Sequence, residues 1–131
     1  MAKISLMAKF NVLEKGFYKF KVTDAKYDAV KNRVTVELMT EAGETHREIF
    51  SFEKKDGAVN DGALWAFSDF VQKAMKDDNI REIDTDELIG KYIQGNIIHQ
   101  EVGDKKYPKL QDREVCDDFK EPEVDLGALL G

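Results

Sequence analysis

The spacing of the apolar residues changes twice along this chain, and these changes constrain the fold more than any other feature. Apolar and polar side chains alternate over much of residues 16–52 and 91–115, which is the two-residue period of half-buried strands. Between these stretches, from Asp61 onward, apolar residues recur every three or four positions, which is the period of an amphipathic helix. The sequence therefore predicts the order β-β-β-α-β-β within 131 residues.

The first stretch divides into three expected strands. Alternation is clear in residues 16–24 and 33–40, and residues 45–52 are rich in strand-forming side chains. Residues 25–32 are interpreted as a polar connection, and Gly43 can adopt positive φ in the turn before the third strand. In that third strand Phe50 and Phe52 share one face and Ile49 takes the other. The sequence leaves open which of these faces points inward.

The helix is expected to begin near Asp61 and to run for about four turns. Its apolar positions recur at helical spacing: Leu64, Phe67, Val71, Ala74 and Met75. Asn60 or Asp61 can cap its start, and the polar residues 77–79 mark its end. Aromatic residues at this spacing are usually core, so we expect Trp65, Phe67 and Phe70 to be buried. Beyond the helix, Asp84 and Glu87 have the spacing of a capping box for one short turn.

Two further strands are expected at residues 91–102 and 106–115, joined by residues 103–105. Gly95 predicts a bulge or sharp bend, and Pro108 confines its strand to a sheet edge or a bulge. Three strands, a helix and a final hairpin follow the order of the OB-fold, a five-stranded, partly open Greek-key barrel. We expect residues 1–115 to form this domain, although other α+β arrangements of five strands and one helix fit the same pattern.

The last sixteen residues, 116–131, differ from the rest of the chain. They read CDDFKEPEVDLGALLG and carry a charge of −4, which leaves −2 for the preceding residues out of a total of −6. Acidic segments with interspersed apolar residues typically order on a partner. We therefore expect an acidic C-terminal tail that binds partner proteins through its apolar side chains: Phe119, Leu126, Leu129 and Leu130.

The remaining composition argues against several classes of protein. Cys116 is the only cysteine and cannot pair within the chain, which favours a reducing compartment such as the cytoplasm. Residues 1–10 contain no apolar run long enough for a signal peptide, and no segment has the roughly twenty apolar residues of a membrane span, so neither secretion nor membrane insertion is expected. His46 and His99 are far apart, so no metal site or cofactor is expected. No motif supplies a nucleophile with its base, and an enzyme is not predicted.

Both loops that flank the ligand face of an OB-fold combine cations with an aromatic ring in this sequence. That face is formed by the second and third strands, between the loop that joins strands one and two and the loop that joins strands four and five. Lysines follow phosphates, and aromatic faces stack on bases. The candidate nucleic-acid-binding residues are Lys26, Tyr27, Lys31 and Arg33 at the first loop, with Lys105, Lys106, Tyr107 and Lys109 at the second.

The segments GFYKFKVTD, GKYIQGNIIHQEVGDKKYPKL and DDFKEPEVDL, in this order of elements, resemble the small OB-fold single-stranded-DNA-binding proteins encoded by bacteriophages. The resemblance implies DNA cover during phage replication or recombination in the bacterial host. It also implies a tail that recruits replication or recombination proteins and competes for the DNA groove. The alternative is a protein-interaction or oligomerisation module on an OB-type barrel, with LGALLG docking on a partner or another copy. An oligosaccharide or small-ligand binder is a third possibility.

Overall fold

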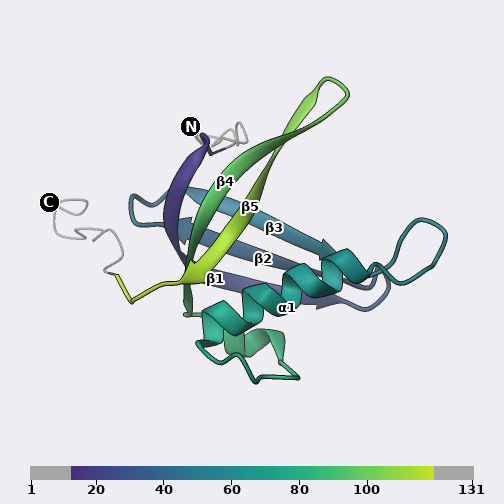
Figure 1. The fold of residues 1–131 in the computed structure, drawn as a ribbon, viewed down its shortest axis with the longest axis horizontal. Helices are drawn as coiled ribbons and strands as arrows, with labels where there is room; N and C mark the ends of the chain where they lie inside the picture. Colours follow the sequence, from purple (N-terminus) through teal and green to yellow (C-terminus); the bar gives the residue numbers. More distant parts are fainter. Residues whose placement is uncertain (1–12, 120–131) are drawn as a thin grey trace, which may run out of the picture.

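The structure, a computed structural model, describes residues 13–119 as an antiparallel five-stranded sheet with one α-helix (Figure 1). In chain order the elements are β1 (Gly16–Asp28), β2 (Arg33–Thr40), β3 (Thr45–Ser51), α1 (Asp61–Met75), the 3-10 helix η1 (Thr85–Leu88), β4 (Tyr92–Val102) and β5 (Lys105–Val115). The predicted β-β-β-α-β-β order is confirmed.

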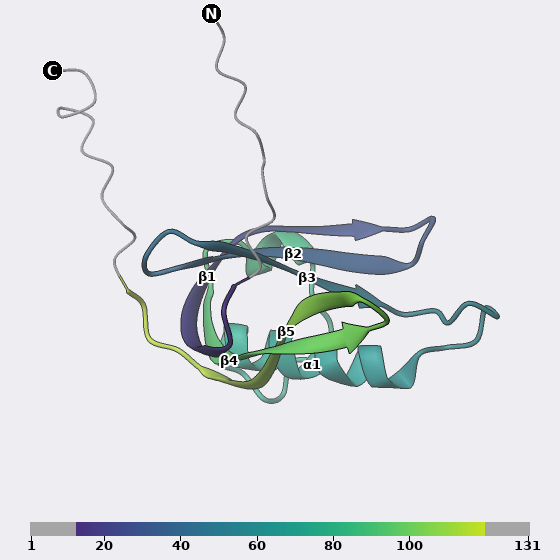
Figure 2. The same ribbon diagram turned by 90° about the horizontal axis from the view of Figure 1, so that it is seen from above.

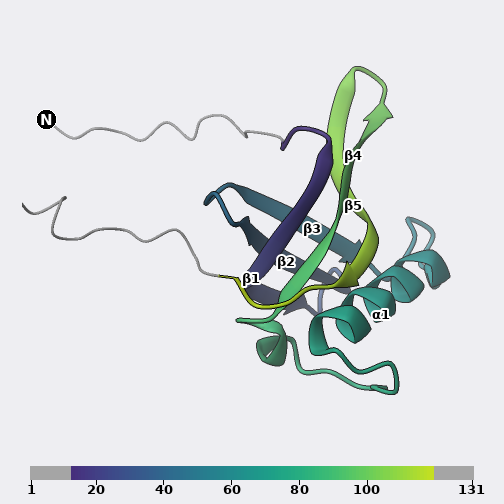
Figure 3. The ribbon, with the colours of Figure 1, turned by 60° about the vertical axis from the view of Figure 1, so that its left-hand side comes forward.

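The strands lie in the order β3-β2-β1-β4-β5, and every neighbouring pair is antiparallel. The sheet curves strongly, as Figures 1 and 2 show, which is consistent with a barrel-like OB fold. It is not closed, because β3 and β5 are its two edges within the described residues. Helix α1 packs against β3, β4 and β5 and so lies beside this opening (Figure 3).

Strand β1 is longer than the sequence predicted, and the reason is a β-bulge. The register of β1 against β2 shifts between Val22 and Asp24. Such an extra residue reverses which positions face inward. Phe20 and Val22 are buried before the shift, and Ala25 is buried after it. The expected polar connection at residues 25–32 is therefore wrong, since the strand continues to Asp28 and the turn is confined to residues 29–32.

Gly95 lies where β5 crowds β4. The register of this pair shifts between Gln94 and Asn96, which confirms the predicted irregularity. A Cβ atom at Gly95 would lie 2.8 Å from the carbonyl oxygen of Gln111 and 2.8 Å from Leu110 Cδ1. Only glycine allows the two backbones to approach this closely. The strand that carries Pro108 is a sheet edge, as that residue predicted.

The core lies between the inner face of the sheet and α1. Phe50 is buried and packs against Phe67 and Phe70 of the helix, with ring centroids 5.2 and 5.7 Å apart. Ile49 is 48% exposed, so the Phe50 face of β3 points inward. Burial of one such side chain stabilises the fold by about 1.5–3 kcal/mol. These aromatic contacts fasten α1 to β3.

The prediction that all three helix aromatics are buried is wrong for Trp65, which is 71% exposed. Phe70 is fully buried, and Phe67 is partly buried against the core. Leu64 is also exposed. The inward stripe of α1 is therefore centred on Phe70, Val71 and Ala74, and the first turn of the helix presents apolar side chains to solvent.

Both predicted helix starts are confirmed. The Asn60 side chain accepts a hydrogen bond from the backbone N–H of Ala63 and caps α1. Asp84 and Glu87 form the expected capping box at η1. Among the described residues, no helix is long and apolar enough to cross a membrane.

Candidate nucleic-acid interface

The hairpin formed by β4 and β5 carries four of the predicted binding residues on its outer strand. Its turn consists of Gly103 and Asp104, between the paired residues Val102 and Lys105. The four residues all belong to β5 and are exposed: Lys105, Lys106, Tyr107 and Lys109. Alternation along a strand places Lys105, Tyr107 and Lys109 on one face. This hairpin therefore brings two cations and a ring together on one face.

The hairpin formed by β1 and β2 distributes its residues differently. Lys26 and Tyr27 are neighbours in β1, so they point to opposite faces of the sheet. The Tyr27 hydroxyl donates to Asn32 Oδ1 at 2.7 Å, and its ring lies on the side of Phe52 and Phe67. Lys31 is exposed in the turn. The structure thus separates the ring of this hairpin from its cations.

Figures 1 and 2 both place the tips of these two hairpins toward the same side of the molecule. The loop between β3 and α1 projects on this side as well, and it carries Lys54 and Lys55, both exposed. Sequence reasoning missed these two lysines, although an adjacent pair in a polar connection is a recognisable signal. Among the described residues, Lys31, Lys105 and Lys109 have no ion-pair partner. We call this side of the molecule the cationic end; its lysines are Lys31, Lys54, Lys55, Lys105 and Lys109.

The outer face of β2 and β3 between the hairpins is mixed in charge. Arg47 Nη2 lies 2.8 Å from Glu37 Oε1 across the two strands. Lys26 Nζ lies 3.6 Å from Asp24 Oδ2 on β1. Arg33 opens β2 and is half-buried. Two of these cations are therefore already paired with carboxylates, and the hairpin tips themselves carry the acids Asp28 and Asp104 beside their lysines.

Glu48 bridges the open side of the sheet between β3 and β5. Its carboxylate accepts a hydrogen bond from the backbone N–H of Leu110 at 2.5 Å, and Oε1 lies 2.7 Å from His46 Nε2. The side chains of Glu48 and His46 are both buried. On the same strand, the Arg113 side chain binds Asp69 of α1 at 2.8 Å and the carbonyl of Leu110 at 2.8 Å. Side chains rather than a backbone ladder therefore hold β5 on its free side.

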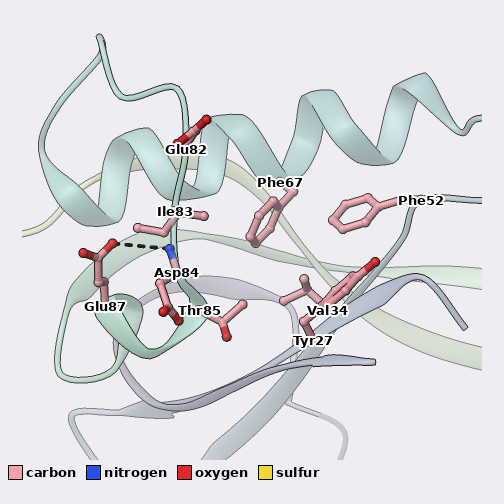
Figure 4. A pocket seen from close by; sticks show the side chains of 9 residues that line it. All are labelled: Tyr27, Val34, Phe52, Phe67, Glu82, Ile83, Asp84, Thr85 and Glu87. Atoms are coloured by element: carbon pink, nitrogen blue, oxygen red, sulfur yellow. Dashed lines mark hydrogen bonds between the residues drawn. The ribbon is translucent and has the colours of Figure 1, made fainter. Parts of the chain in front are cut away.

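A pocket of about 750 Å³ lies beneath the tip of the β1–β2 hairpin, between the sheet, α1 and the segment that contains η1 (Figure 4). Aromatic, aliphatic and acidic side chains line it: Tyr27, Val34, Phe52, Phe67, Glu82, Ile83, Asp84, Thr85 and Glu87. None of these lining residues is a cation. Carboxylates repel phosphate groups, so this pocket is unsuited to an anionic ligand such as a nucleic acid.

The base of the expected tail packs on the folded domain. Cys116 is buried, and burial raises the pKa of its thiol despite the opposing charge of Lys19. The Phe119 ring contacts Tyr92 of β4 edge-on at 5.0 Å. Figures 1 and 3 show this end of the chain at the opposite end of β5 from the hairpin tip. The predicted partner-binding residues Leu126, Leu129 and Leu130 lie outside the described residues.

No group of three or more histidine, cysteine, aspartate or glutamate side chains in residues 13–119 is arranged to hold a metal ion. Two features of the described residues are candidate binding surfaces: the cationic end and the acidic pocket. They use opposite faces of the β1–β2 hairpin. No protein-family model matches the chain, and no curated protein matches its sequence.

Proposed function

We propose that this chain binds single-stranded DNA without catalysing a reaction. The sugar-phosphate backbone of the DNA would run across the outer face of β2 and β3, between the two hairpins of an OB-type Greek-key barrel. The strand order and the position of α1 after β3 support this barrel. By the resemblance to phage proteins, the activity serves DNA replication or recombination in the bacterial cytoplasm.

The observation that carries the proposal is that the two hairpin tips with their lysines project toward the same side of the molecule. Lys31, Lys105 and Lys109 come from hairpins more than seventy residues apart and have no ion-pair partner in the described part of the chain. Tyr107 lies between two of them and is 47% exposed, so its ring is free to stack on a base. Unpaired cations beside an exposed ring are what sequence-tolerant binding of a single strand requires.

The tail is proposed as a competitor for the same surface and as a recruitment segment for replication or recombination proteins. It leaves the domain at Phe119, away from the hairpin tips. Twelve further residues follow, and a chain of that length reaches up to about 40 Å when extended. The last acid, Asp125, is six residues beyond Phe119 and reaches about 20 Å from it, so the charge of the tail approaches only the nearer part of the DNA surface, and the apolar end of the tail extends further.

Titration of oligo-dT into the full-length protein tests the proposal. We expect submicromolar binding at low salt, little sequence preference, and a salt slope near −0.7 for each phosphate contacted. Removal of residues 120–131 should tighten binding while leaving Cys116 and Phe119 in place. Absence of oligonucleotide binding at low salt would refute the proposal, and unchanged affinity after truncation would refute the competing tail.

The exposed first turn of α1 favours a second candidate function, a protein-interaction module. Trp65, Leu64 and Val59 are all exposed close together in sequence, and tryptophan is enriched at binding hot spots. A Trp65→Ala variant distinguishes the two functions. DNA binding should not change, whereas an interaction module would lose its partner or its self-association.

A further inference from the structure

We propose that the acidic pocket binds the lysine-containing N-terminal segment, residues 1–12, of a second copy of this chain. The proposal does not depend on DNA binding. It rests on the shape and charge of the pocket, on the composition of the segment, and on the position where the segment joins the fold.

The pocket combines an aromatic wall with carboxylates that are held in place. Phe52 and Phe67 pack together with ring centroids 5.5 Å apart, and Tyr27 lies beside them in Figure 4. On the other side, Glu87 Oε2 accepts from the backbone N–H of Asp84 at 3.3 Å, and Asp84 Oδ1 accepts from Asp86 at 3.1 Å. The Asp84 carboxylate also accepts from the backbone N–H of Glu87, whereas Oε1 of Glu87 takes no part in the capping box. A site of this kind suits a cation that is carried on an apolar stem.

The chemistry of lysine fits this pocket better than that of other ligand classes. The lining contains three carboxylates and no cation, so an anionic or phosphorylated ligand would be repelled. The described residues contain no cluster that could hold a metal ion. A lysine places its methylene chain against the rings and its ammonium group near Glu82 or Glu87.

Residues 1–12, MAKISLMAKFNV, have the complementary composition. Lys3 and Lys9 are the charged residues of the segment, and the first acid of the chain is Glu14. This stands out in a chain with 26 acidic residues. Most of the other side chains in the segment are apolar. The segment therefore offers both the cation and the hydrophobic surface that the pocket can accept.

The position of Leu13 favours a segment from another copy. Leu13 is buried near the start of β1, where its carbonyl oxygen lies 2.7 Å from His99 Nε2. The pocket residue Tyr27 lies near the other end of that strand, eleven residues beyond Gly16, or roughly 36 Å along the strand. Lys9 is only four residues before Leu13 and reaches about 14 Å from it, and Lys3, ten residues before Leu13, reaches about 35 Å only when the segment is fully extended. A second copy can instead bring both lysines to the pocket.

Sedimentation of the full-length protein tests this inference without DNA. We expect concentration-dependent self-association that weakens as salt rises. Glu82→Gln/Glu87→Gln should weaken it at least fivefold, and Lys3→Gln/Lys9→Gln should do the same. The matched control Asp77→Asn/Asp78→Asn removes the same charge from residues outside the pocket and should leave association unchanged. Gln at position 87 can still accept the capping hydrogen bond, and circular dichroism verifies the fold.

A charge exchange makes the test specific. Lys3→Glu/Lys9→Glu and Glu82→Lys/Glu87→Lys should each fail to self-associate, whereas their mixture should form the mixed complex. A protein that stays monomeric at low salt and high concentration would overturn the inference. It would also be overturned if the pocket variants behaved like the Asp77/Asp78 control, or if the mixture failed to associate.

Discussion

The two hairpins that carry the predicted binding residues have similar sequences of cations and rings but different structures. In the β1–β2 hairpin, Lys26 and Tyr27 are adjacent and therefore lie on opposite faces, with the ring turned to the acidic pocket. In the β4–β5 hairpin, Lys105, Tyr107 and Lys109 are two residues apart and share a face. Spacing in the strand, rather than composition, decides whether a cation and a ring can act on one ligand.

Their supports differ as well. In the β1–β2 hairpin, β3 pairs with β2 along its length, and β4 pairs with β1 over residues 16–21, the half away from the tip. The outer strand of the β4–β5 hairpin is a sheet edge, held on its free side by Glu48 and Arg113. The hairpin whose cations and ring share a face is thus the one whose outer strand has no neighbouring strand on its far side. The predictions below test this contrast.

Charge reversal at the β4–β5 hairpin should have the largest effect. Lys105→Glu/Lys106→Glu/Lys109→Glu is expected to weaken oligo-dT binding about 100-fold at low salt and to reduce the magnitude of the salt slope by about 2. Reversal of Lys26 and Lys31 should cost less, because Lys26 already pairs with Asp24 at 3.6 Å.

Fluorescence titration at several salt concentrations measures both quantities. Reversal of three lysines distant from the hairpin tips, Lys15, Lys76 and Lys91, provides the control for net charge. An equal loss in this control would mean that the hairpin has no special role.

Removal of the Glu48 carboxylate should have the next largest effect. Glu48→Ala leaves the Leu110 N–H and the buried His46 without this partner, at a cost of about 2 kcal/mol in the free energy of unfolding. Glu48→Gln keeps an acceptor oxygen and should cost less. Urea unfolding measures the difference. If Glu48→Ala were as stable as the unsubstituted protein, the side-chain support of β5 would be unimportant.

Much of this architecture was predictable because it follows from local sequence. Asn60 and Asp84 mark helix starts with their own hydrogen bonds, and the alternation of β2 fixes its buried face. The extension of β1 was missed because the bulge after Val22 changes the phase of alternation. Trp65 was misplaced because helical spacing shows that a stripe exists but does not show where a neighbouring strand will cover it.

The candidate sites depend on contacts that sequence patterns do not show. Alternation places Glu48 on the same face as Phe50, but its partner Leu110 is 62 residues away and no sequence pattern predicts that hydrogen bond. Tyr27 looks like a ring beside a lysine, and only the position of the bulge turns it toward Phe52 and Phe67. Contacts between residues far apart in the sequence therefore determine what these two side chains bind or face.

Removal of each hairpin ring gives a smaller, matched comparison. Tyr107→Ala should weaken oligo-dT binding about tenfold, within the range of 1 to 3 kcal/mol for base stacking on one ring. Tyr27→Ala should change binding less than about twofold, because its ring lies on the pocket side. Equal losses from the two variants, measured at the same salt concentration, would show that both rings contact DNA.

The pH dependence of stability should show the smallest effect and concerns the buried end of β5. Burial raises the pKa of the Cys116 thiol, so the folded state holds its proton at pH values where the unfolded chain has lost it. The contribution is complete below the ordinary thiol pKa of about 8.5, and it is lost as the pH rises through the higher pKa of the folded state. Stability should therefore fall on the alkaline side. In urea unfolding, the free energy of unfolding of Cys116→Ser should decline less between neutral and alkaline pH than that of the unsubstituted protein. An identical decline would assign the pH dependence to other groups, such as Tyr18, whose pKa is also raised by burial.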